Sequence, residues 1–398
     1  MFNPEFSIFD DWMFGKLNNL LSDKKPPKDS NQIFLNIGEP QLNPPDILKE
    51  TINRYSSEWR KYTPSNGTRS FREAVSNYIS RRYPSAANFL DIDNEITPVP
   101  GTRAPLYQIG SFFRNADINK NTSLVTNPFY HAWRAGATAT GNNILWMNAD
   151  FSSNWLPDIS SIDSKTLKKS SIMYICTPTN PHGAIASLSW LAKVINLCRK
   201  NNILLCVDEC YADIYRDENS PPPGTLEALK LLNDGTKGVV VLHSLSKRSS
   251  CPGLRAGFMA GDPKIIAMYR KLVANGGVVL SEPQLKAAEA LYQDDTHVKI
   301  SRDFYNKNFS LSETLLKFQK PDAGFFHFIP VDNDLEATKH LWEHYGIKIM
   351  PGSFMSANTP KGNPSKGFLR IALVHNLKIT KEALSKIARG LEDLKCHQ

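Results

Sequence analysis

The pattern of apolar residues along the chain predicts a parallel sheet whose strands alternate with helices. Four short runs are almost continuously apolar, which is typical of strands that are buried on both faces. These runs are residues 123–126, 172–176, 203–207 and 238–242. Stretches with a helical pattern lie around them, for example residues 104–113 and the amphipathic segment that begins near residue 68. The alternation of strands and helices indicates an α/β fold.

The pattern changes in the last third of the chain. Residues 274–277 are predicted to form a flexible loop and residues 282–294 a helix. The last strands and helices then alternate in an α+β pattern, with strands at 324–328 and 368–373 and helices at 335–345 and 380–394. We therefore expect an N-terminal arm with part of a small domain in residues 1–45, a large domain in 46–282 and a small C-terminal domain in 283–398.

The N-terminal arm is apolar at first and then polar. Phe9, Trp12 and Phe14 precede a charged, proline-rich segment at 23–30, so this arm needs a surface to lie on. A short strand is predicted at 33–37.

Composition narrows the possible partners. The 398 residues carry a formal net charge of +8, which favours anionic small molecules. No basic block with interleaved aromatic residues is present, so nucleic-acid binding is not expected. No apolar run approaches the length of a membrane span, and the first residues do not resemble a signal peptide. The six cysteines form no CxxC pair and read as reduced thiols, so we expect a cytoplasmic protein.

Polar residues follow the predicted strands. Lys247 lies just beyond the strand at 238–242, with Ser244 before it and Arg255 after it. Ligands of open α/β sheets gather at the carboxyl ends of strands, and a hydroxyl, an ammonium and a guanidinium together suit an anionic ligand. A solvated loop lysine is the alternative for Lys247 taken alone.

The segment Ser-x-Ser-Lys followed by Pro-Gly-x-Arg-x-Gly resembles the lysine segment of the class I/II, fold-type I aminotransferases, which depend on pyridoxal 5'-phosphate. The resemblance implies a large domain with a mostly parallel sheet flanked by helices, plus a smaller α+β domain. It also implies that Lys247 binds the cofactor covalently and that Ser244 and Arg255 hold its phosphate. A lysine amine attacks a carbonyl, and the bound cofactor stabilises a carbanion at the substrate α-carbon.

Other strand ends match the family's cofactor site. By resemblance Asp208 lies beside the pyridine nitrogen, Tyr211 donates to the ring oxygen, Asn180 bonds that oxygen, and Tyr130 stacks on the ring. Residues 101–103 open a predicted helix, and the free N–H groups of a helix start are a natural phosphate seat, which makes Thr102 and Arg103 candidates. A plain turn at Asn180 and a core aromatic at Tyr130 are the structural alternatives.

The resemblance also assigns the substrate's α-carboxylate and a second subunit. Gly38 would contact the carboxylate, Asn180 would lie near it, and Arg370 would bind it. Arg370 stands inside an apolar strand, where an unpaired charge is costly, so it needs an anionic partner; a structural carboxylate is the alternative. Tyr62 would reach the phosphate of a neighbouring subunit, which implies a homodimer with shared active sites.

Two further patterns resemble a nucleotide site and a metal site, but each lacks a required residue. An apolar strand that ends in Asp-Glu, at Asp208, is also typical of P-loop nucleotidases, but GxxxxGK[ST] is absent. His340 and His344 share a helix face at metal-ligand spacing without HExxH or a third ligand, so a solvated face is favoured and no metal is expected.

Within the family the likeness is greatest to the proteobacterial N-succinyldiaminopimelate aminotransferases. It rests on Asn-Ile-Gly-Glu-Pro at 36–40, Asn-Pro-Phe-Tyr at 127–130, Asp-Glu-Cys-Tyr at 208–211 and His-Ser-Leu-Ser-Lys-Arg-Ser at 243–249, and it departs at 104–105 and 177–179. It implies transamination between N-succinyl-LL-2,6-diaminopimelate and 2-oxoglutarate or glutamate in lysine biosynthesis. Arg103 is the candidate for the substrate's distal end, with a solvated arginine as the alternative.

The alternatives for the reaction are an aminotransferase for aspartate, alanine or aromatic amino acids, and a pyridoxal phosphate-dependent β-lyase. A transcription regulator built on this fold is not favoured, since an arm of about thirty residues cannot supply a DNA-binding domain.

Overall fold

The computed structural model describes residues 4–396 except 11, 30 and 115. Residues 1–3, Asp11 and Ser30 of the predicted arm therefore lie outside the described residues, and the side chains of residues 4–6 are not described. Within the described chain, no helix is long and apolar enough to cross a membrane.

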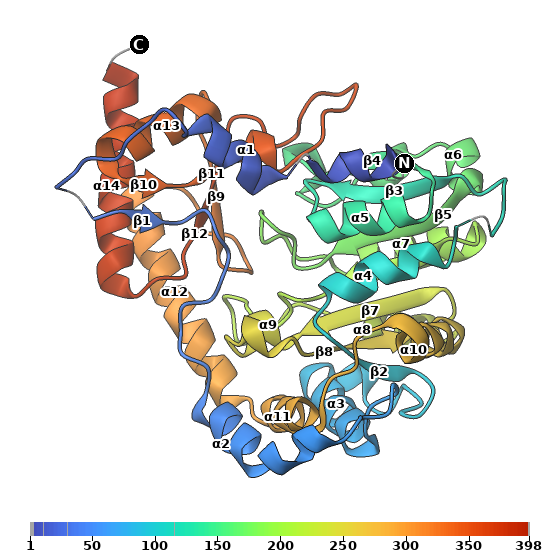
Figure 1. The fold of residues 1–398 in the computed structure, drawn as a ribbon. Helices are drawn as coiled ribbons and strands as arrows, with labels where there is room; N and C mark the ends of the chain where they lie inside the picture. The colour runs from blue at the N-terminus through green and yellow to red at the C-terminus, as the bar shows by residue number, and fades with distance from the viewer. Residues whose placement is uncertain (1–3, 11, 30, 115, 397–398) are drawn as a thin grey trace.

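A seven-stranded sheet forms the centre of the larger part of the molecule (Figure 1). Its spatial order is β2-β8-β7-β6-β5-β3-β4, and neighbouring strands are parallel except that β8 is antiparallel to both β2 and β7. The strands are β2 (Ile96–Val99), β3 (Thr122–Asn127), β4 (Asn143–Asn148), β5 (Ser170–Cys176), β6 (Leu204–Asp208), β7 (Val239–Ser244) and β8 (Gly257–Gly261). The four predicted strands are confirmed within about two residues at each end.

Helices cover both faces of this sheet and bury two separate cores. One core joins the sheet to α3 (Arg69–Arg82), α7 (Leu188–Lys200), α8 (Thr225–Leu232) and α11 (Glu282–Gln293). The other joins it to α4 (Arg103–Ser111), α5 (His131–Ala139) and α10 (Pro263–Gly276). Because both faces are covered, the strands are apolar on both faces, which is why they read as continuous apolar runs. The remaining helices of this part are α2 (Asp46–Arg54), α6 (Ser164–Lys169) and α9 (Leu245–Arg248).

A second, smaller sheet lies beside the first (Figure 1). It is antiparallel, in the order β11-β12-β9, from β9 (Phe326–Pro330), β11 (Met350–Pro351) and β12 (Phe368–Ala372). Its helices are α12 (Thr296–Leu316), α13 (Asp334–Tyr345) and α14 (Leu377–Cys396), and a parallel pair joins β1 (Ile33–Phe34) to β10 (Ile347–Lys348). The expected small α+β unit is therefore present and includes part of the N-terminal arm.

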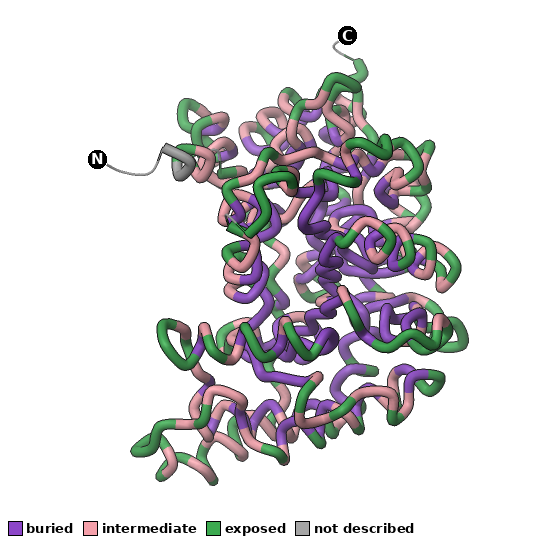
Figure 2. The backbone as a smooth tube through the Cα atoms, turned by 90° about the vertical axis from the view of Figure 1, so that its right-hand side faces the viewer, coloured by how far each residue is buried: buried purple, intermediate pink, exposed green. Residues whose placement is uncertain are grey.

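The arm lies on the small unit. Helix α1 (Met13–Leu20) buries Leu17 against Trp342, Met350 and Met355. The buried residues run as a continuous band through the centre of the molecule, and the exposed ones lie on its outer loops and helices (Figure 2).

Three expectations about elements differ from the structure. Strand β1 ends at Phe34 instead of residue 37, and β9 begins at Phe326 instead of residue 324. The predicted loop at 274–277 is wrong for its first three residues, because α10 continues to Gly276. Val273 of this helix packs in the sheet core, and this packing outweighs the low helix propensity of Gly276, whereas Gly277 lies outside the helix.

The proposed division at residue 282 stays a prediction, and the packing bears on it. Leu285, Ala288 and Leu291 of α11 are buried in the core of the large sheet. This packing favours a boundary after α11, at the start of α12.

Candidate active site

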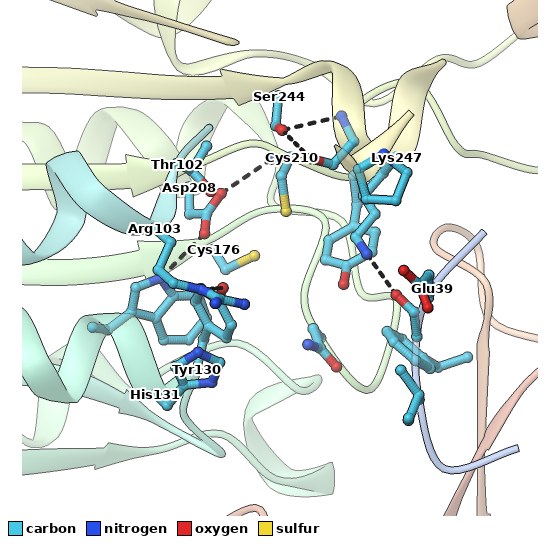
Figure 3. A pocket seen from close by; sticks show the side chains of 18 of the residues that line it. Glu39, Thr102, Arg103, Tyr130, His131, Cys176, Asp208, Cys210, Ser244 and Lys247 are labelled. Atoms are coloured by element: carbon cyan, nitrogen blue, oxygen red, sulfur yellow. Dashed lines mark hydrogen bonds between the residues drawn. The ribbon is translucent and has the colours of Figure 1, made fainter. Parts of the chain in front are cut away.

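A cavity of about 300 Å³ opens at the carboxyl ends of β5, β6 and β7, between the two sheets (Figure 3). Every predicted site residue except Tyr62 lines it: Gly38, Thr102, Arg103, Tyr130, Asn180, Asp208, Tyr211, Ser244, Lys247, Arg255 and Arg370. The carboxyl ends of neighbouring parallel strands meet at one edge, so residues far apart in the sequence come together there.

Lys247 is held at the centre of the cavity by a short helix. Ser244 caps α9: its Oγ accepts from the Ser246 N–H at 3.1 Å and donates to the Ser246 hydroxyl at 2.9 Å. The Lys247 Nζ donates to the Gly38 carbonyl at 2.5 Å. Burial lowers the pKa of Lys247 to about 8. A substantial fraction of its amine is therefore neutral, and thus nucleophilic, slightly above neutral pH.

Asp208 is a buried carboxylate whose hydrogen-bond donors are neutral. Its Oδ2 accepts from the Trp133 Nε1–H at 3.2 Å, and its Oδ1 accepts from the Cys210 backbone N–H at 3.3 Å. Burial raises the pKa of Asp208, and the bonds from Trp133 and Cys210 act in the opposite direction. A cationic ring nitrogen in the cavity would supply the positive partner that this carboxylate lacks.

Sequence reasoning missed Trp133. The signal was its spacing, since Trp133 lies three residues after Tyr130 at the start of α5, and residues at that spacing share one side of a helix. Glu39, His131, Cys176 and Cys210 also line the cavity without having been predicted (Figure 3).

Arg255 and the start of α4 form a cationic corner. The Arg255 Nη1 donates to the Pro252 carbonyl at 2.8 Å, and its Nη2 donates to the Pro100 carbonyl at 3.2 Å. Gly101 lets the guanidinium come close, because a Cβ there would lie 2.4 Å from the Arg255 Nη2. Thr102 precedes the first turn of α4, whose free N–H groups carry the positive end of the helix dipole. The corner suits a phosphate.

Arg103, the first residue of α4, contacts Tyr130 at the N-terminus of α5. The Arg103 Nε donates to the Tyr130 hydroxyl oxygen at 3.2 Å. Burial raises the pKa of Tyr130, so its phenol stays neutral. Arg103 is exposed at the mouth of the cavity, where its charge is available to a ligand.

Arg370 is buried in β12 at the other side of the cavity. Its Nη2 donates to the Asn36 carbonyl at 2.8 Å, its guanidinium lies 4.3 Å from the centre of the Phe326 ring, and its Nε has no partner. Among the described residues it forms no ion pair with a carboxylate, so the alternative of a structural carboxylate partner finds no support. Burial lowers the pKa of Arg370 to about 10, which leaves it charged at neutral pH.

Gly38 and Asn180 also line the cavity. A Cβ at Gly38 would lie 2.2 Å from the Phe326 ring, so only glycine fits there. The side-chain Oδ1 of Asn180 is buried without a hydrogen-bond partner, which leaves it free to bond a ligand.

Tyr62 is the exception among the predicted residues. It is fully exposed and lies outside the cavity of its own chain, in the loop between η2 (Ser56–Arg60) and α3.

The residues of the cavity fit pyridoxal 5'-phosphate. The Lys247 amine complements its aldehyde, the Asp208 carboxylate its protonated pyridine nitrogen, and the Arg255 corner its phosphate. The remaining cationic group, Arg370, lies at the end of the cavity where a substrate carboxylate would be bound.

Comparisons with known proteins agree with this geometry. Residues 30–387 match the family Aminotransferase class I and II. The chain is 26% identical over 371 residues to an LL-diaminopimelate aminotransferase of Nitratidesulfovibrio vulgaris, covering 89% of this chain and 90% of that one.

Solved structures show the same fold. An aminotransferase of Neisseria meningitidis superimposes with a TM-score of 0.91 at 30% identity, covering 96% of this chain and 97% of that one. An aminotransferase of Helicobacter pylori gives 0.88 at 30% identity, with coverage of 99% and 100%. A probable N-succinyldiaminopimelate aminotransferase of Thermus thermophilus gives 0.81 at 21% identity, with coverage of 95% and 100%. The match over nearly the whole chain, together with a cavity that fits pyridoxal 5'-phosphate, shows that this protein belongs to the class I and II aminotransferases, which use that cofactor.

Proposed function

We propose that this aminotransferase exchanges an amino group between N-succinyl-LL-2,6-diaminopimelate and the pair 2-oxoglutarate and glutamate. The observation that carries the proposal is Arg370, a buried charge at the end of the cavity that holds Lys247, with no carboxylate partner among the described residues. Both substrates present an α-carboxylate, and each has a second anionic group.

The proposed roles follow from the geometry. Bound pyridoxal phosphate supplies an electron sink for the pair of electrons released at the substrate α-carbon. Lys247 would hold the cofactor through its aldehyde carbon, and its amine, once displaced by the substrate's amino group, would move the proton at the substrate α-carbon, since its lowered pKa suits both tasks. Asp208 keeps the pyridine nitrogen protonated. Burial raises the pKa of Tyr211, so its phenol stays protonated and donates to the ring oxygen.

The binding roles are divided between the two sheets. Arg255, Thr102 and Ser244 hold the phosphate on the side of the large sheet. Arg370 and Asn180 hold the α-carboxylate, and Gly38 gives it room.

Two observations favour a diaminopimelate-type donor: the side chains at the mouth of the cavity and the names of the related enzymes. The mouth has apolar side chains, from Met13, Phe14 and Ile37, that can cover a methylene chain, and the cationic Arg103 for a distal carboxylate. The curated relatives are LL-diaminopimelate aminotransferases at about 26% identity, which makes unsuccinylated LL-diaminopimelate the second candidate donor.

A panel of amino donors with 2-oxoglutarate as acceptor tests the substrate. The kcat/KM for the succinylated donor should exceed that for aspartate, alanine and aromatic donors at least roughly a hundredfold, about 2.7 kcal/mol of transition-state binding. LL-diaminopimelate as the best donor would select the second candidate. Equal or higher values with aspartate or an aromatic amino acid would indicate a general aminotransferase.

Product analysis separates transamination from β-elimination. Transamination yields a 2-oxo acid and a new amino acid in equal amounts, whereas a β-lyase releases ammonia and pyruvate. Release of ammonia without an amino acceptor would overturn the proposed reaction.

We propose that the active unit is a homodimer in which each active site contains residues of both subunits. We also propose that the protein is cytoplasmic. The fully exposed Tyr62, outside its own cavity, supports a role in the site of a second copy.

A further inference from the structure

Four aromatic rings, which we call the ring stack, connect the large sheet to the small sheet beside the cavity. Trp155 stacks on His182 with the ring centroids 4.2 Å apart and an interplanar angle of 18°. His182 meets Phe328 edge-on at 4.8 Å, and Phe328 stacks on Phe368 at 4.7 Å and 6°. Trp155 and His182 follow strands β4 and β5 of the large sheet, whereas Phe328 and Phe368 belong to β9 and β12 of the small sheet.

The small-sheet half of the ring stack adjoins Arg370. Phe328 and Arg370 are direct partners in the antiparallel register of β9 and β12, so their side chains lie on the same face of the sheet. Phe326 and Phe368 lie two residues from these partners and share that face, because side chains alternate along a strand. The strand pair that carries Arg370 therefore rests on the ring stack.

The large-sheet half adjoins Asn180. His182 follows Asn180 by two residues, in a loop closed by the bond from the Gly183 N–H to the Thr179 carbonyl at 2.8 Å. The same loop is tied to the small unit, since the Ala323 N–H donates to the Gly183 carbonyl at 3.1 Å. The His182 side chain is buried, and burial lowers its pKa to about 3, so a neutral ring is stacked at this position.

The backbone at Trp155 adopts an uncommon conformation to present its ring. Asn154 and Trp155 have φ angles of 53° and 58°, in the left-handed region that bulky residues avoid. The turn is held by the bond from the Trp155 N–H to the Asp150 carbonyl at 2.8 Å and by the capping of residues 151–153 by Asp150. Unfavourable conformations of this kind persist where the surrounding structure requires them, often at functional sites.

We propose that the ring stack is a positioning device that sets the separation between Asn180 on the large sheet and Arg370 on the small sheet. Stacked rings pack at a fixed spacing, so they transmit the position of one sheet to the other. This inference rests on the proposed function of Asn180 and Arg370 in holding the substrate α-carboxylate.

The test uses His182→Ala and Phe368→Leu in the enzyme loaded with pyridoxal phosphate. Each variant opens the ring stack and leaves the cavity residues in place. The KM for glutamate and for 2-oxoglutarate should rise about tenfold, while kcat falls less than about threefold and the Kd for the cofactor stays within about twofold. His182→Phe keeps a ring and should restore KM to within about threefold. Phe34→Ala removes a ring of the Phe34–Trp342 pair, 6.2 Å apart in the small unit, and is the control, with unchanged KM.

A double-mutant cycle with Arg370→Lys locates the effect. If the ring stack acts through Arg370, His182→Ala should raise KM less than about twofold in the Arg370→Lys background. An unchanged KM in both His182→Ala and Phe368→Leu overturns the ring stack as a positioning device. If KM and the Kd for the cofactor rise by the same factor, the ring stack is overturned as well, because such a result indicates general damage to the fold. An unchanged KM in Arg370→Lys alone overturns the assigned role of Arg370, and the inference with it.

Discussion

At the scale of single residues, burial gives the cavity its chemistry. The Lys247 ammonium loses water contacts, so its pKa falls to about 8, and the same loss raises the pKa of the Asp208 carboxyl and the Tyr211 phenol. An amine that deprotonates easily, a carboxylate that needs a positive partner and a phenol that keeps its proton are what a protonated pyridine aldehyde requires.

The first residue prediction concerns Lys247. Lys247→Ala should still bind pyridoxal phosphate noncovalently but lower kcat at least about a hundredfold, because the group proposed to move the α-proton is lost. In the wild-type protein stripped of cofactor, the rate of covalent loading should rise with pH around 8 instead of near 10.5, the ordinary lysine pKa. Visible absorbance of the bound cofactor measures its noncovalent binding to the variant and the rate of covalent loading of the wild-type protein. Normal turnover by the variant would exclude Lys247 from this role.

The second residue prediction concerns Gly101. Gly101→Ala should raise the Kd for pyridoxal phosphate at least about tenfold, because the new Cβ would lie 2.4 Å from the Arg255 Nη2 and the φ of +71° disfavours alanine. Gly253→Ala, near Arg255, is the matched control, since its Cβ would meet nothing within 4 Å. The Kd follows from titration of the apoprotein with the cofactor. Equal affinities in the two variants would show that Arg255 needs no such approach.

At the scale of elements, a buried carboxylate ties α3 and α9 to the loop after β6. Asp213 accepts from the Tyr78 hydroxyl at 2.8 Å and lies 3.2 Å from both Arg82 and Arg248. Burial would raise the pKa of Asp213, but the charges of Arg248 and Arg82 outweigh it, so its pKa is lowered. The stabilisation by this carboxylate is thus complete above its ordinary pKa of 3.8 and is lost as the pH falls through the lower folded value.

We predict that the Asp213→Asn variant is less stable than the wild-type protein. The variant removes the carboxylate that pairs with the buried Arg82 and leaves the buried Arg248 with only the exposed Asp295, so the free energy of unfolding should fall by about 3–5 kcal/mol at pH 7. Asp234→Asn, at an exposed ion pair with Arg199, is the control and should cost about 0–1 kcal/mol. Urea unfolding of the apoproteins compares them. Similar small losses in both variants would mean that the buried network contributes little.

At the scale of the whole molecule, the cavity lies between two sheets and one predicted residue lies outside it. If Tyr62 serves the partner's phosphate, a mixture of Tyr62→Ala and Lys247→Ala chains should regain activity. Random exchange makes half of the dimers hybrid, each with one intact site, so about a quarter of the sites become active. Activity after mixing measures the recovery.

Lys247→Ala mixed with Asp208→Asn is the matched control for subunit exchange. Both residues line one chain's cavity, so no hybrid has an intact site and no recovery is expected. No recovery in the Tyr62 mixture, despite measured subunit exchange, would contradict shared sites.

The sequence by itself determined the buried strands and the chemistry at their ends. Continuous apolar runs in β3, β5, β6 and β7 follow from burial on both faces, and polar residues directly after such strands meet at one edge. Lys247, Asp208 and Asn180 could therefore be assigned to one site from their positions in the chain. Strands β2, β4 and β8 were not recognised, because β2 is short and contains Pro98, β4 is only partly buried, and β8 begins and ends in glycine.

Only the tertiary structure decided which side chains support that site. The Trp133 bond to Asp208, the approach of Arg255 over Gly101 and the ring stack between the sheets join residues from elements that local pattern does not pair. The same holds for Arg370, whose strand pattern showed only that a buried charge needs a partner. It also holds for α10, which packing extends to Gly276 although local propensity would place these residues in a loop. Local pattern records which face of an element is buried, whereas these contacts depend on which elements pack against each other.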